Sequence, residues 1–341
     1  MSPQGRPKGE HRSAQHEGPP VSPPTFSVAT PTRNALDKLK RCVGSVRGQS
    51  GVSVEHLVQD ACSSDGTARW LVEQQGLRGA DGLSGLSGLS GLSALHGVSE
   101  PDAGMYDAIN RAWSRSSGSL LSWLNADEQY LPGTLEKVQA FFQARPDVDV
   151  LFADYLVADS QGRAVALRRE IPLRRFYVNN LFLNAQSCTL FYRRSWWDRG
   201  LLRLDSQYRY AADKDLVLRL QAAGASFHHM DDVLSVFGVD GSNLSTHDGM
   251  TREAEAVRLA HGGFRWRPLR VLPALARRVE RLARGGYARV DLQYRYALDE
   301  VPHYQDYLAR GLSGRYHLGQ TEGQAQALNP GSATARRENP P

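Results

Sequence analysis

Apolar positions in the first half of the chain alternate between two spacings, which predict strands and helices in turn. Short β-rich runs at Phe26–Thr30 and Val54–Val58 predict two strands, and a third strand is expected just before Glu100. The helix expected between the first two strands carries its apolar residues at helical spacing, at Leu36, Leu39, Val43 and Val46. Further helices are expected from Thr67 and from Met105.

Leu120–Leu124 is an apolar run typical of a strand that is covered on both faces. Alternating strands and helices indicate an α/β protein with a Rossmann-like, mostly parallel central sheet and helices on both faces. Ligands of such sheets bind at the carboxyl ends of the strands. The segments that directly follow each strand are therefore the candidates for a functional site.

The domain organisation follows from shifts in composition. Residues 1–24 and 319–341 are rich in Pro, Gly and charge, and we expect disordered tails there. Residues 25–248 form the expected α/β domain, and residues 249–318 are expected to be a C-terminal helical extension. Within the domain, residues 82–93 repeat Gly-Leu-Ser without proline, which favours a flexible insertion over a collagen-like helix.

Composition narrows the class of protein. With 41% hydrophobic residues the chain can bury a full core, and its net charge of +5 is mild. Its 3 cysteines are scattered and form no CxxC pair, which favours a reducing compartment. Because the sequence has no run of 18 apolar residues and no export signal at its start, we expect a cytoplasmic protein.

Residues 265–284 form a basic amphipathic segment. Leu272, Leu275, Val279 and Leu282 share one helical face, and arginines occupy most of the rest. Such a helix can lie on an anionic bilayer, which would place the protein peripherally at the inner membrane face. The alternative is a terminal helix that caps the core with its apolar face.

Polar, turn-rich segments follow each of the four strands. Thr30–Asn34 follows the first strand, Asp60 the second, Asp102 the third and Asn125–Asp127 the fourth. Asp60 can accept a hydrogen bond from a base, and Asp127 can hold a divalent cation through hard oxygen ligands. Such a cation would neutralise a departing diphosphate. Neither a GxGxxG nor a GxxxxGK[ST] loop is present, which disfavours dinucleotide oxidoreductases and P-loop enzymes.

A second candidate segment covers residues 211–220, with the sequence AADKDLVLRL. Asp215 is expected at the start of a helix, where it would act as a cap. Asp213, just before it, would be free to project into a cleft and deprotonate an acceptor hydroxyl. The alternative is that Asp213 is only a second negative charge at the helix N-terminus.

Together these segments resemble family 2 of the inverting glycosyltransferases, whose fold is called GT-A. The resemblance covers about residues 26–245, and more weakly 286–318. The most specific pieces are TPTRN at 30–34, SSDGT at 63–67, SEPDAGMYDAIN at 99–110, NADEQYLPGTLE at 125–136, QSCTLFYRR at 186–194 and AADKDLVLRL at 211–220. Each piece is weakly specific alone, but their order and spacing are specific.

The resemblance implies roles for matching positions. Thr30, Pro31 and Arg33 would line the base and ribose pocket, Asp60 would read the base, and Asp102 would border the donor site. Asn125 would contact ribose or sugar, Asp127 would bind Mg²⁺ or Mn²⁺, and Asp213 would be the catalytic base. Gln186 would lie on the acceptor side, and His247 is a weaker candidate for a late metal ligand.

The implied reaction is transfer of a sugar from a nucleotide-sugar donor, with UDP favoured, to a carbohydrate or lipid-linked acceptor. Inversion follows from a single displacement, and surface polysaccharide or glycoconjugate biosynthesis is the expected context. A sugar-phosphate nucleotidyltransferase would need a Gly- and Arg-rich loop after the first strand, which TPTRN does not supply. No nucleic-acid-binding signature is present.

Four positions depart from the family pattern: Cys62, Asn125, Glu128 and Ala212. Asn125 replaces the commoner aspartate, although an amide still hydrogen-bonds a hydroxyl. Glu128 stands where relatives carry a second aspartate, and its longer side chain would reshape metal binding. A catalytically degenerate binding or scaffold protein therefore remains the alternative.

Overall fold

The computed structural model describes residues 25–76, 93–239, 248–301, 303–314 and 325–327. Its first half contains β1 (Phe26–Thr32), α1 (Leu36–Arg47), β2 (Val54–Asp60), α2 (Thr67–Gly76), β3 (Ser93–Ser99), α3 (Met105–Ser114) and β4 (Leu120–Trp123). The strands and helices predicted for this half are therefore confirmed.

The second half is more mixed, with strands of 3 to 12 residues. It comprises β5 (Glu128–Tyr130), α4 (Thr134–Ala144), β6 (Val150–Ala158), β7 (Ala164–Arg168), α5 (Arg175–Asn180), η1 (Ser187–Thr189), β8 (Phe191–Arg193), α6 (Arg194–Asp198), α7 (Ala212–Ala222), β9 (Phe227–Gly238), α8 (Asp248–Ala260), η3 (Arg267–Arg270), α9 (Val271–Ala283), β10 (Val290–Ala297), β11 (Tyr304–Leu312) and β12 (Ala325–Ala327).

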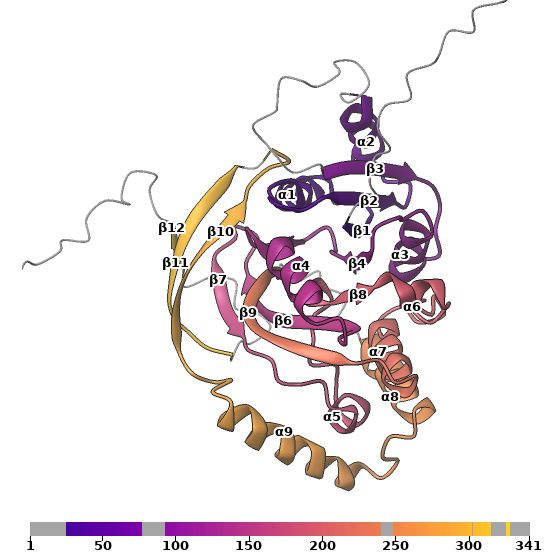
Figure 1. Cartoon of the computed structure of the whole chain (residues 1–341), viewed down its shortest axis with the longest axis vertical. Helices are drawn as coiled ribbons and strands as arrows, with labels where there is room; N and C mark the ends of the chain where they lie inside the picture. The colour runs from indigo at the N-terminus through magenta and orange to yellow at the C-terminus, as the bar shows by residue number, and fades with distance from the viewer. Residues whose placement is uncertain (1–24, 77–92, 240–247, 302, 315–324, 328–341) are drawn as a thin grey trace, which may run out of the picture.

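A nine-stranded sheet forms the centre of the described residues, in the order β3-β2-β1-β4-β8-β6-β9-β5, with β7 paired to β6 (Figure 1). Strands β1 to β4 pair in parallel, as do β6 and β9, while β5, β7 and β8 pair antiparallel to their neighbours. The predicted mostly parallel sheet is therefore confirmed. Thr32 is in register with Asp60, which is in register with Ser99, so three strand ends meet at one edge.

Alternate residues of the strands pack on two different faces of the sheet. Val28 belongs to a buried cluster with residues of α1 and α4, whereas Ala29 belongs to a cluster with α3, α6 and α7. In the second cluster the ring of Trp113 lies 5.4 Å from that of Trp123 and 6.0 Å from that of Tyr192. Helices therefore cover both faces, as the alternation of side chains in a strand requires.

The C-terminal part is helical only as far as Ala283, so the expected helical extension over 249–318 is partly wrong. Strands β10, β11 and β12 form a separate antiparallel sheet instead, and β12 lies within the stretch expected to be a disordered tail. The reason is a two-residue period, because buried Tyr294 and Tyr296 alternate with exposed Gln293 and Arg295.

This small sheet is anchored to the main domain through β5. The side-chain amide of Gln129 donates to the Ala297 carbonyl at 3.0 Å, and the Ala297 N–H donates back to the Gln129 Oε1 at 2.9 Å. The phenol of Tyr294 likewise donates to the Gly162 carbonyl at 2.6 Å. The C-terminal sheet is thus fixed beside the segment that follows β4.

Several predictions fall on residues outside the described ranges. These are the N-terminal tail at 1–24, the Gly-Leu-Ser repeat up to residue 92, His247, and the C-terminal tail apart from β12. Among the helices of the described residues, none is long and apolar enough to cross a bilayer.

Candidate functional site

The loops after β1 and β2 are joined into one surface. The Asn34 N–H donates to Ser63 Oγ at 2.7 Å, and the Ser64 N–H donates to Asn34 Oδ1 at 2.8 Å. The Asp65 carboxylate accepts the N–H of Leu36, the first residue of α1, at 2.9 Å. The predicted nucleotide-binding segments 30–34 and 60–67 are therefore held together by contacts among their own residues.

Two non-glycine residues in these loops adopt the left-handed region, Asn34 with φ 50° and Cys62 with φ 52°. Asparagine tolerates this region, but cysteine is strained there by its Cβ. A glycine, which the resemblance to family 2 implies at the position of Cys62, would adopt this region without strain. Strain of this kind clusters at ligand-binding segments.

Asp60 lies at the end of β2 and is fully buried. Its carboxylate accepts the Ser63 N–H at 3.1 Å, the Ser63 hydroxyl, and the Ser99 hydroxyl at 2.6 Å. A carboxylate offers about four lone-pair sites. Asp60 therefore shapes the loop and keeps about one site for a ligand, and its direct contact with a base stays a prediction.

The loop after β3 brings Asp102 toward the segment that follows β1. Burial raises the pKa of Asp102, against the opposing effects of a hydrogen bond from the Gly104 N–H and the positive charge of Arg33. The Gly104 N–H donates to Asp102 Oδ1 at 2.9 Å. The structure thus places Arg33 and Asp102, both predicted donor-site residues, within electrostatic reach of each other.

The segment Asn125–Asp127 forms the turn between β4 and β5. The Oδ1 of Asn125 is buried and has no hydrogen-bond partner among the described residues. An unpaired buried acceptor is costly, and a ligand hydroxyl would satisfy it. Asn125 therefore presents an acceptor oxygen, and its contact with a ribose or sugar hydroxyl stays a prediction.

Glu128 does not point outward beside Asp127. It is fully buried and accepts the Asn125 N–H at 2.8 Å and the Ser187 hydroxyl at 3.2 Å. Burial, followed by the charge of Asp127, raises the pKa of Glu128 to about 8, against a hydrogen bond from Gln186. Glu128 therefore ties the Asn125–Asp127 turn to Gln186.

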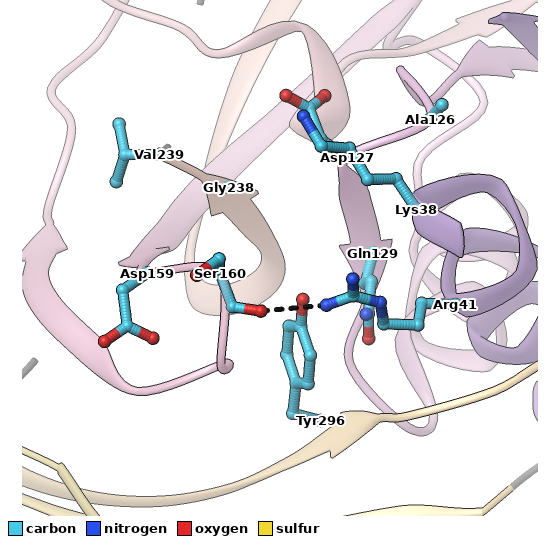
Figure 2. A pocket seen from close by; sticks show the side chains of 10 residues that line it. All are labelled: Lys38, Arg41, Ala126, Asp127, Gln129, Asp159, Ser160, Gly238, Val239 and Tyr296. Atoms are coloured by element: carbon cyan, nitrogen blue, oxygen red, sulfur yellow. Dashed lines mark hydrogen bonds between the residues drawn. The ribbon is translucent and has the colours of Figure 1, made fainter. Parts of the chain in front are cut away.

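Asp127 lines a small pocket at the carboxyl end of the sheet (Figure 2). Lys38 extends from α1 toward the Asp127 carboxylate, and Arg41 donates to the Ser160 carbonyl at 2.8 Å. Gly238 closes the pocket, since a Cβ there would lie 2.5 Å from the Asp127 carbonyl oxygen. Tyr296 enters from β10.

Lys38, Arg41 and Tyr296 were missed by the sequence reasoning. Lys38 and Arg41 are three residues apart on the helix that follows TPTRN, which places them on one face toward the strand ends. That spacing could have found them. Tyr296 comes from the far end of the chain, and no local pattern connects it to Asp127.

A divalent cation in this pocket would need ligands from a substrate as well as from the protein. Within the described residues no cluster of three or more His, Cys, Asp or Glu could enclose a metal ion. Mg²⁺ usually binds through one or two carboxylates together with substrate phosphates and water. The half-buried Asp127 carboxylate fits a cation whose remaining ligands come from a diphosphate.

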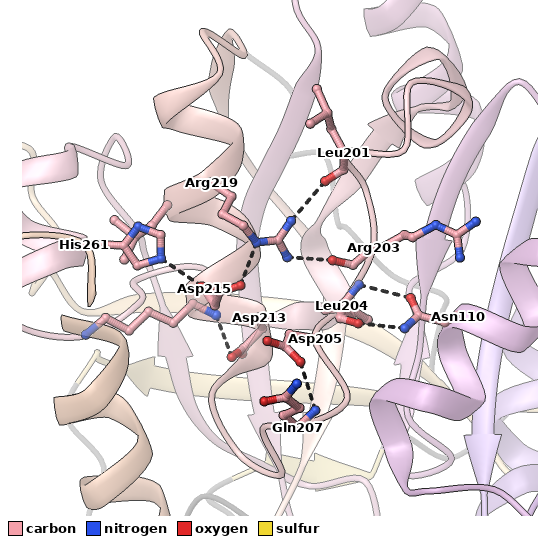
Figure 3. Close-up of polar contacts among 12 residues, drawn as sticks. Asn110, Leu201, Arg203, Leu204, Asp205, Gln207, Asp213, Asp215, Arg219 and His261 are labelled. Carbon is pink, nitrogen blue, oxygen red and sulfur yellow. Dashed lines mark hydrogen bonds and ion pairs between the residues drawn. The ribbon is translucent and has the colours of Figure 1, made fainter. Parts of the chain in front are cut away.

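Asp213 lies in the first turn of α7 and is half-buried (Figure 3). Burial raises its pKa to about 6, against hydrogen bonds from the Lys214 N–H and the Tyr106 hydroxyl. The Lys214 N–H donates to Asp213 Oδ1 at 2.7 Å. A carboxylate with a pKa near the working pH is suited to remove a proton.

The segment before Asp213 is clamped by α8. The Glu253 carboxylate accepts the backbone N–H groups of Tyr210 at 2.6 Å and Ala211 at 3.1 Å, as well as that of Arg209. A carboxylate at these amides also complements the helix dipole of α7. Glu253, which sequence reasoning did not single out, thus fixes the approach to Asp213.

Asp215 is not the helix cap that was predicted, because α7 begins at Ala212 and has no side-chain cap. Its carboxylate instead accepts from Arg219 at 2.7 Å and from His261 at 2.8 Å. Arg219 also donates to the Leu201 and Arg203 carbonyls, at 3.2 and 2.6 Å (Figure 3). Asp215 is therefore structural, and Asp213 stays the candidate base of this segment.

Tyr106 links the two halves of the site. Tyr106 is the second residue of α3, which directly follows the loop that carries Asp102. Its hydroxyl bonds Asp213. It is buried, and burial together with the charge of Asp213 raises its own pKa well above the usual range. The Tyr106 hydroxyl therefore keeps its proton throughout the physiological pH range and can donate it to the Asp213 carboxylate.

We expect Tyr106→Phe to raise the pKa of Asp213, because the hydrogen bond that favours the carboxylate is lost. The acidic limb of kcat/KM for donor turnover should move from about pH 6 upward by roughly 0.5 to 1 unit. Tyr177→Phe, whose hydroxyl bonds Glu280 at 2.9 Å, is the matched control. An unshifted limb in Tyr106→Phe would show that this bond does not tune Asp213.

Comparisons with known proteins identify the family and the fold. Residues 27–200, half of the chain, match Glycosyl transferase family 2. An uncharacterized glycosyltransferase of Mycobacterium tuberculosis is 37% identical over 111 residues, covering 32% of this chain and 36% of that protein. The chain thus spans little more than a third of that relative's length.

A PGL/p-HBAD biosynthesis glycosyltransferase of Mycobacterium tuberculosis is 27% identical over 206 residues, covering 58% of this chain and 70% of that protein. Among solved structures, Staphylococcus aureus TarS 1-349 in complex with UDP-GlcNAc aligns with a TM-score of 0.52 at 16% identity, over 76% of this chain and 73% of that one. The similarity to TarS shows a shared fold.

Proposed function

Because the chain belongs to glycosyl transferase family 2, we propose that it transfers a sugar from a nucleoside-diphosphate sugar to a hydroxyl acceptor, with inversion at the anomeric carbon. The observation that carries the proposal is Asp213, a half-buried carboxylate with a pKa of about 6 that is bonded by Tyr106. A carboxylate of this kind is ionised at neutral pH and is suited to accept a proton.

The donor would bind across the strand ends. Thr30, Pro31 and Arg33 line the expected base and ribose pocket, Asp60 offers its remaining lone pair to the base, and Asp102 borders the donor. Asn125 Oδ1, which lacks a partner, accepts a ribose or sugar hydroxyl. UDP is the favoured nucleotide, in keeping with the UDP-GlcNAc bound by TarS.

Asp127 would hold Mg²⁺ or Mn²⁺ against the diphosphate. When bound, the cation supplies positive charge that stabilises the departing nucleoside diphosphate. Lys38, which extends toward Asp127, adds a second positive group at the same place. The chain therefore contributes a carboxylate and an ammonium group where negative charge grows.

The displacement itself rests on Asp213. The acceptor oxygen forms its bond to the anomeric carbon as the bond to the diphosphate oxygen breaks, and Asp213 takes the hydroxyl proton. Glu253 and Arg219 hold the two loops that flank Asp213, so the acceptor meets a fixed surface. Positioning of this kind supplies much of the rate enhancement in such reactions. Gln186, tied to Glu128, borders the acceptor side.

Surface polysaccharide or glycoconjugate biosynthesis is the proposed context, by analogy with the mycobacterial relative whose name places it in PGL/p-HBAD biosynthesis. The acceptor would be a carbohydrate or a lipid-linked molecule. A catalytically degenerate protein would keep the fold but lack the chemistry at Asp213.

Calorimetric titration with UDP, dTDP and GDP, each with and without Mn²⁺, tests the proposal. We expect one nucleotide to bind, and to bind more tightly with the metal, because the diphosphate completes the coordination of a cation at Asp127. Absence of binding by all three nucleotides under both conditions would contradict the proposed donor site. Binding without any turnover of the matching nucleotide sugars would favour the degenerate protein.

A further inference from the structure

Helix α9 exposes its apolar face to solvent, whereas a surface helix of a globular protein normally buries that face. Exposed fractions are 56% for Leu272, 58% for Leu275, 57% for Val279 and 57% for Leu282. Its buried residues are Pro273, Arg277 and Arg281. The alternative that this apolar face caps the core is therefore wrong. Helix α9 turns arginines toward the protein and apolar side chains toward solvent, the reverse of the usual pattern.

Contacts of the inward arginines fix this orientation. Arg277 lies 3.7 Å from the buried carboxylate of Glu170, and its guanidinium stacks over the ring of Phe182 at 4.4 Å. The guanidinium of Arg281 lies 4.8 Å from the ring centroid of Tyr287. Rotating α9 to bury its leucines would break these contacts and leave Glu170 without Arg277.

Glu280 adds a second anchor at the same interface. Its carboxylate accepts from Arg174 at 2.7 Å and from the Tyr177 hydroxyl at 2.9 Å, and both partners lie at the start of α5. Figure 1 shows α9 along the lower edge of the molecule, with α5 between it and the sheet. The apolar face therefore points away from the body of the protein.

Charge around the exposed face identifies its partner. Four of the seven arginines in residues 265–284 are exposed, whereas the one acidic residue, Glu280, is paired inward. Arg278 and Arg284 are exposed beside the leucines, and Trp266 is 65% exposed at the N-terminal end. Two copies of so basic a face would repel each other, whereas anionic lipid headgroups would attract it.

We infer that the exposed face of α9 docks on an anionic phospholipid bilayer, with its leucines and valines at the acyl boundary and its outer arginines at the headgroups. This is the composition of helices that lie in the plane of a membrane interface. Docking on a bilayer explains why α9 leaves a large apolar patch exposed.

The docking surface adjoins the candidate site. Helix α9 packs against α5, and α5 packs against α7, which carries Asp213. Phe176 in α5 is 43% exposed, and Phe182, just after α5, is 47% exposed and contacts Arg277 of α9. If the proposed transfer holds, a lipid-linked acceptor would reach Asp213 from the bilayer on which α9 rests.

Flotation of the full chain with vesicles tests the inference without any donor or acceptor. We expect binding to vesicles of equal parts phosphatidylglycerol and phosphatidylcholine, and much weaker binding to pure phosphatidylcholine. Raising NaCl from about 0.05 to about 0.5 M should weaken the binding, because the Debye length shortens. Replacing Leu272, Leu275 and Val279 together by Gln should lower the partition coefficient by about tenfold or more.

Val72→Gln is the matched control, since Val72 is 70% exposed on α2, and it should bind like the parent. Arg278→Gln combined with Arg284→Gln should reduce binding and its salt dependence. No binding to anionic vesicles, or full binding by the triple Gln variant, would overturn the inference. So would a dimer in solution that the triple variant dissociates, because the face would then serve a second copy. Nucleotide titration of the same variants reports separately on the donor site.

Discussion

Asp213→Asn is expected to lower kcat for sugar transfer by about 10²- to 10⁴-fold while leaving nucleotide affinity unchanged, because the amide cannot take the acceptor proton. Asn has nearly the shape of Asp and can still accept the hydrogen bonds from Lys214 and Tyr106. Parallel measurement of transfer rate and of nucleotide binding by calorimetry separates the two effects. In the parent, activity should fall as the pH drops through about 6.

The same substitution should stabilise the fold. The pKa of Asp213 is about 6 in the folded chain against 3.8 for the ordinary side chain, so the folded state binds the proton more tightly between these values. Stability from this group is present below about pH 4 and is lost as the pH rises through about 6. At pH 7 the buried charge is a cost, and Asn removes it, so thermal unfolding should shift upward.

Asp215→Asn, two residues along α7, supplies the contrast. It weakens the partner of Arg219 and His261, so thermal unfolding should shift downward. A loss of transfer in Asp213→Asn that came with an equal loss of stability would contradict the assignment of Asp213 as the base.

Asp127→Ala is expected to abolish the Mn²⁺-dependent part of nucleotide binding and to lower kcat/KM by about 10²- to 10⁴-fold, equivalent to several kcal/mol of charge stabilisation. The physical reason is that Asp127 is the half-buried carboxylate that faces the pocket, whereas Glu128 is turned inward. Titration with the preferred nucleotide, with and without Mn²⁺, gives the measurement.

Asp232→Asn is the control for Asp127→Ala. Asp232 is a surface carboxylate that pairs with Lys137 at 2.6 Å, remote from the pocket, and its replacement should leave metal-dependent binding intact. If Asp127→Ala kept the Mn²⁺ effect of the parent, another group would have to hold the cation, and the proposed role of Asp127 would fail.

The fold of the first half could be predicted from local patterns. The helical spacing of α1 and the β-rich runs of β1 and β2 each lie within about a dozen residues, and the strand-end rule then located Asp60, Asp102 and Asp127. The C-terminal sheet was not predicted, although its two-residue period at Tyr294 and Tyr296 is visible in the sequence. The helical pattern of the preceding segment was extended over it instead.

Contacts between distant segments could not be predicted in the same way. Tyr106 bonds Asp213 across more than a hundred residues, and Glu253 clamps the start of α7 from α8. The burial of individual side chains could not be predicted either. Asp215 looked like a cap but pairs with Arg219 and His261, and Glu128 looked like a metal neighbour but is enclosed. A sequence shows which residues can ionise but not which of them face solvent.

The family match ends at residue 200, before Asp213, Glu253 and Tyr296. The part that the family model matches therefore carries the proposed donor-binding loops, whereas the proposed base, its clamp and the outer wall of the Asp127 pocket lie beyond it. Under the proposed transfer, substitutions in that remainder would alter which hydroxyl is presented to Asp213 without disturbing the strand ends proposed to hold the nucleotide.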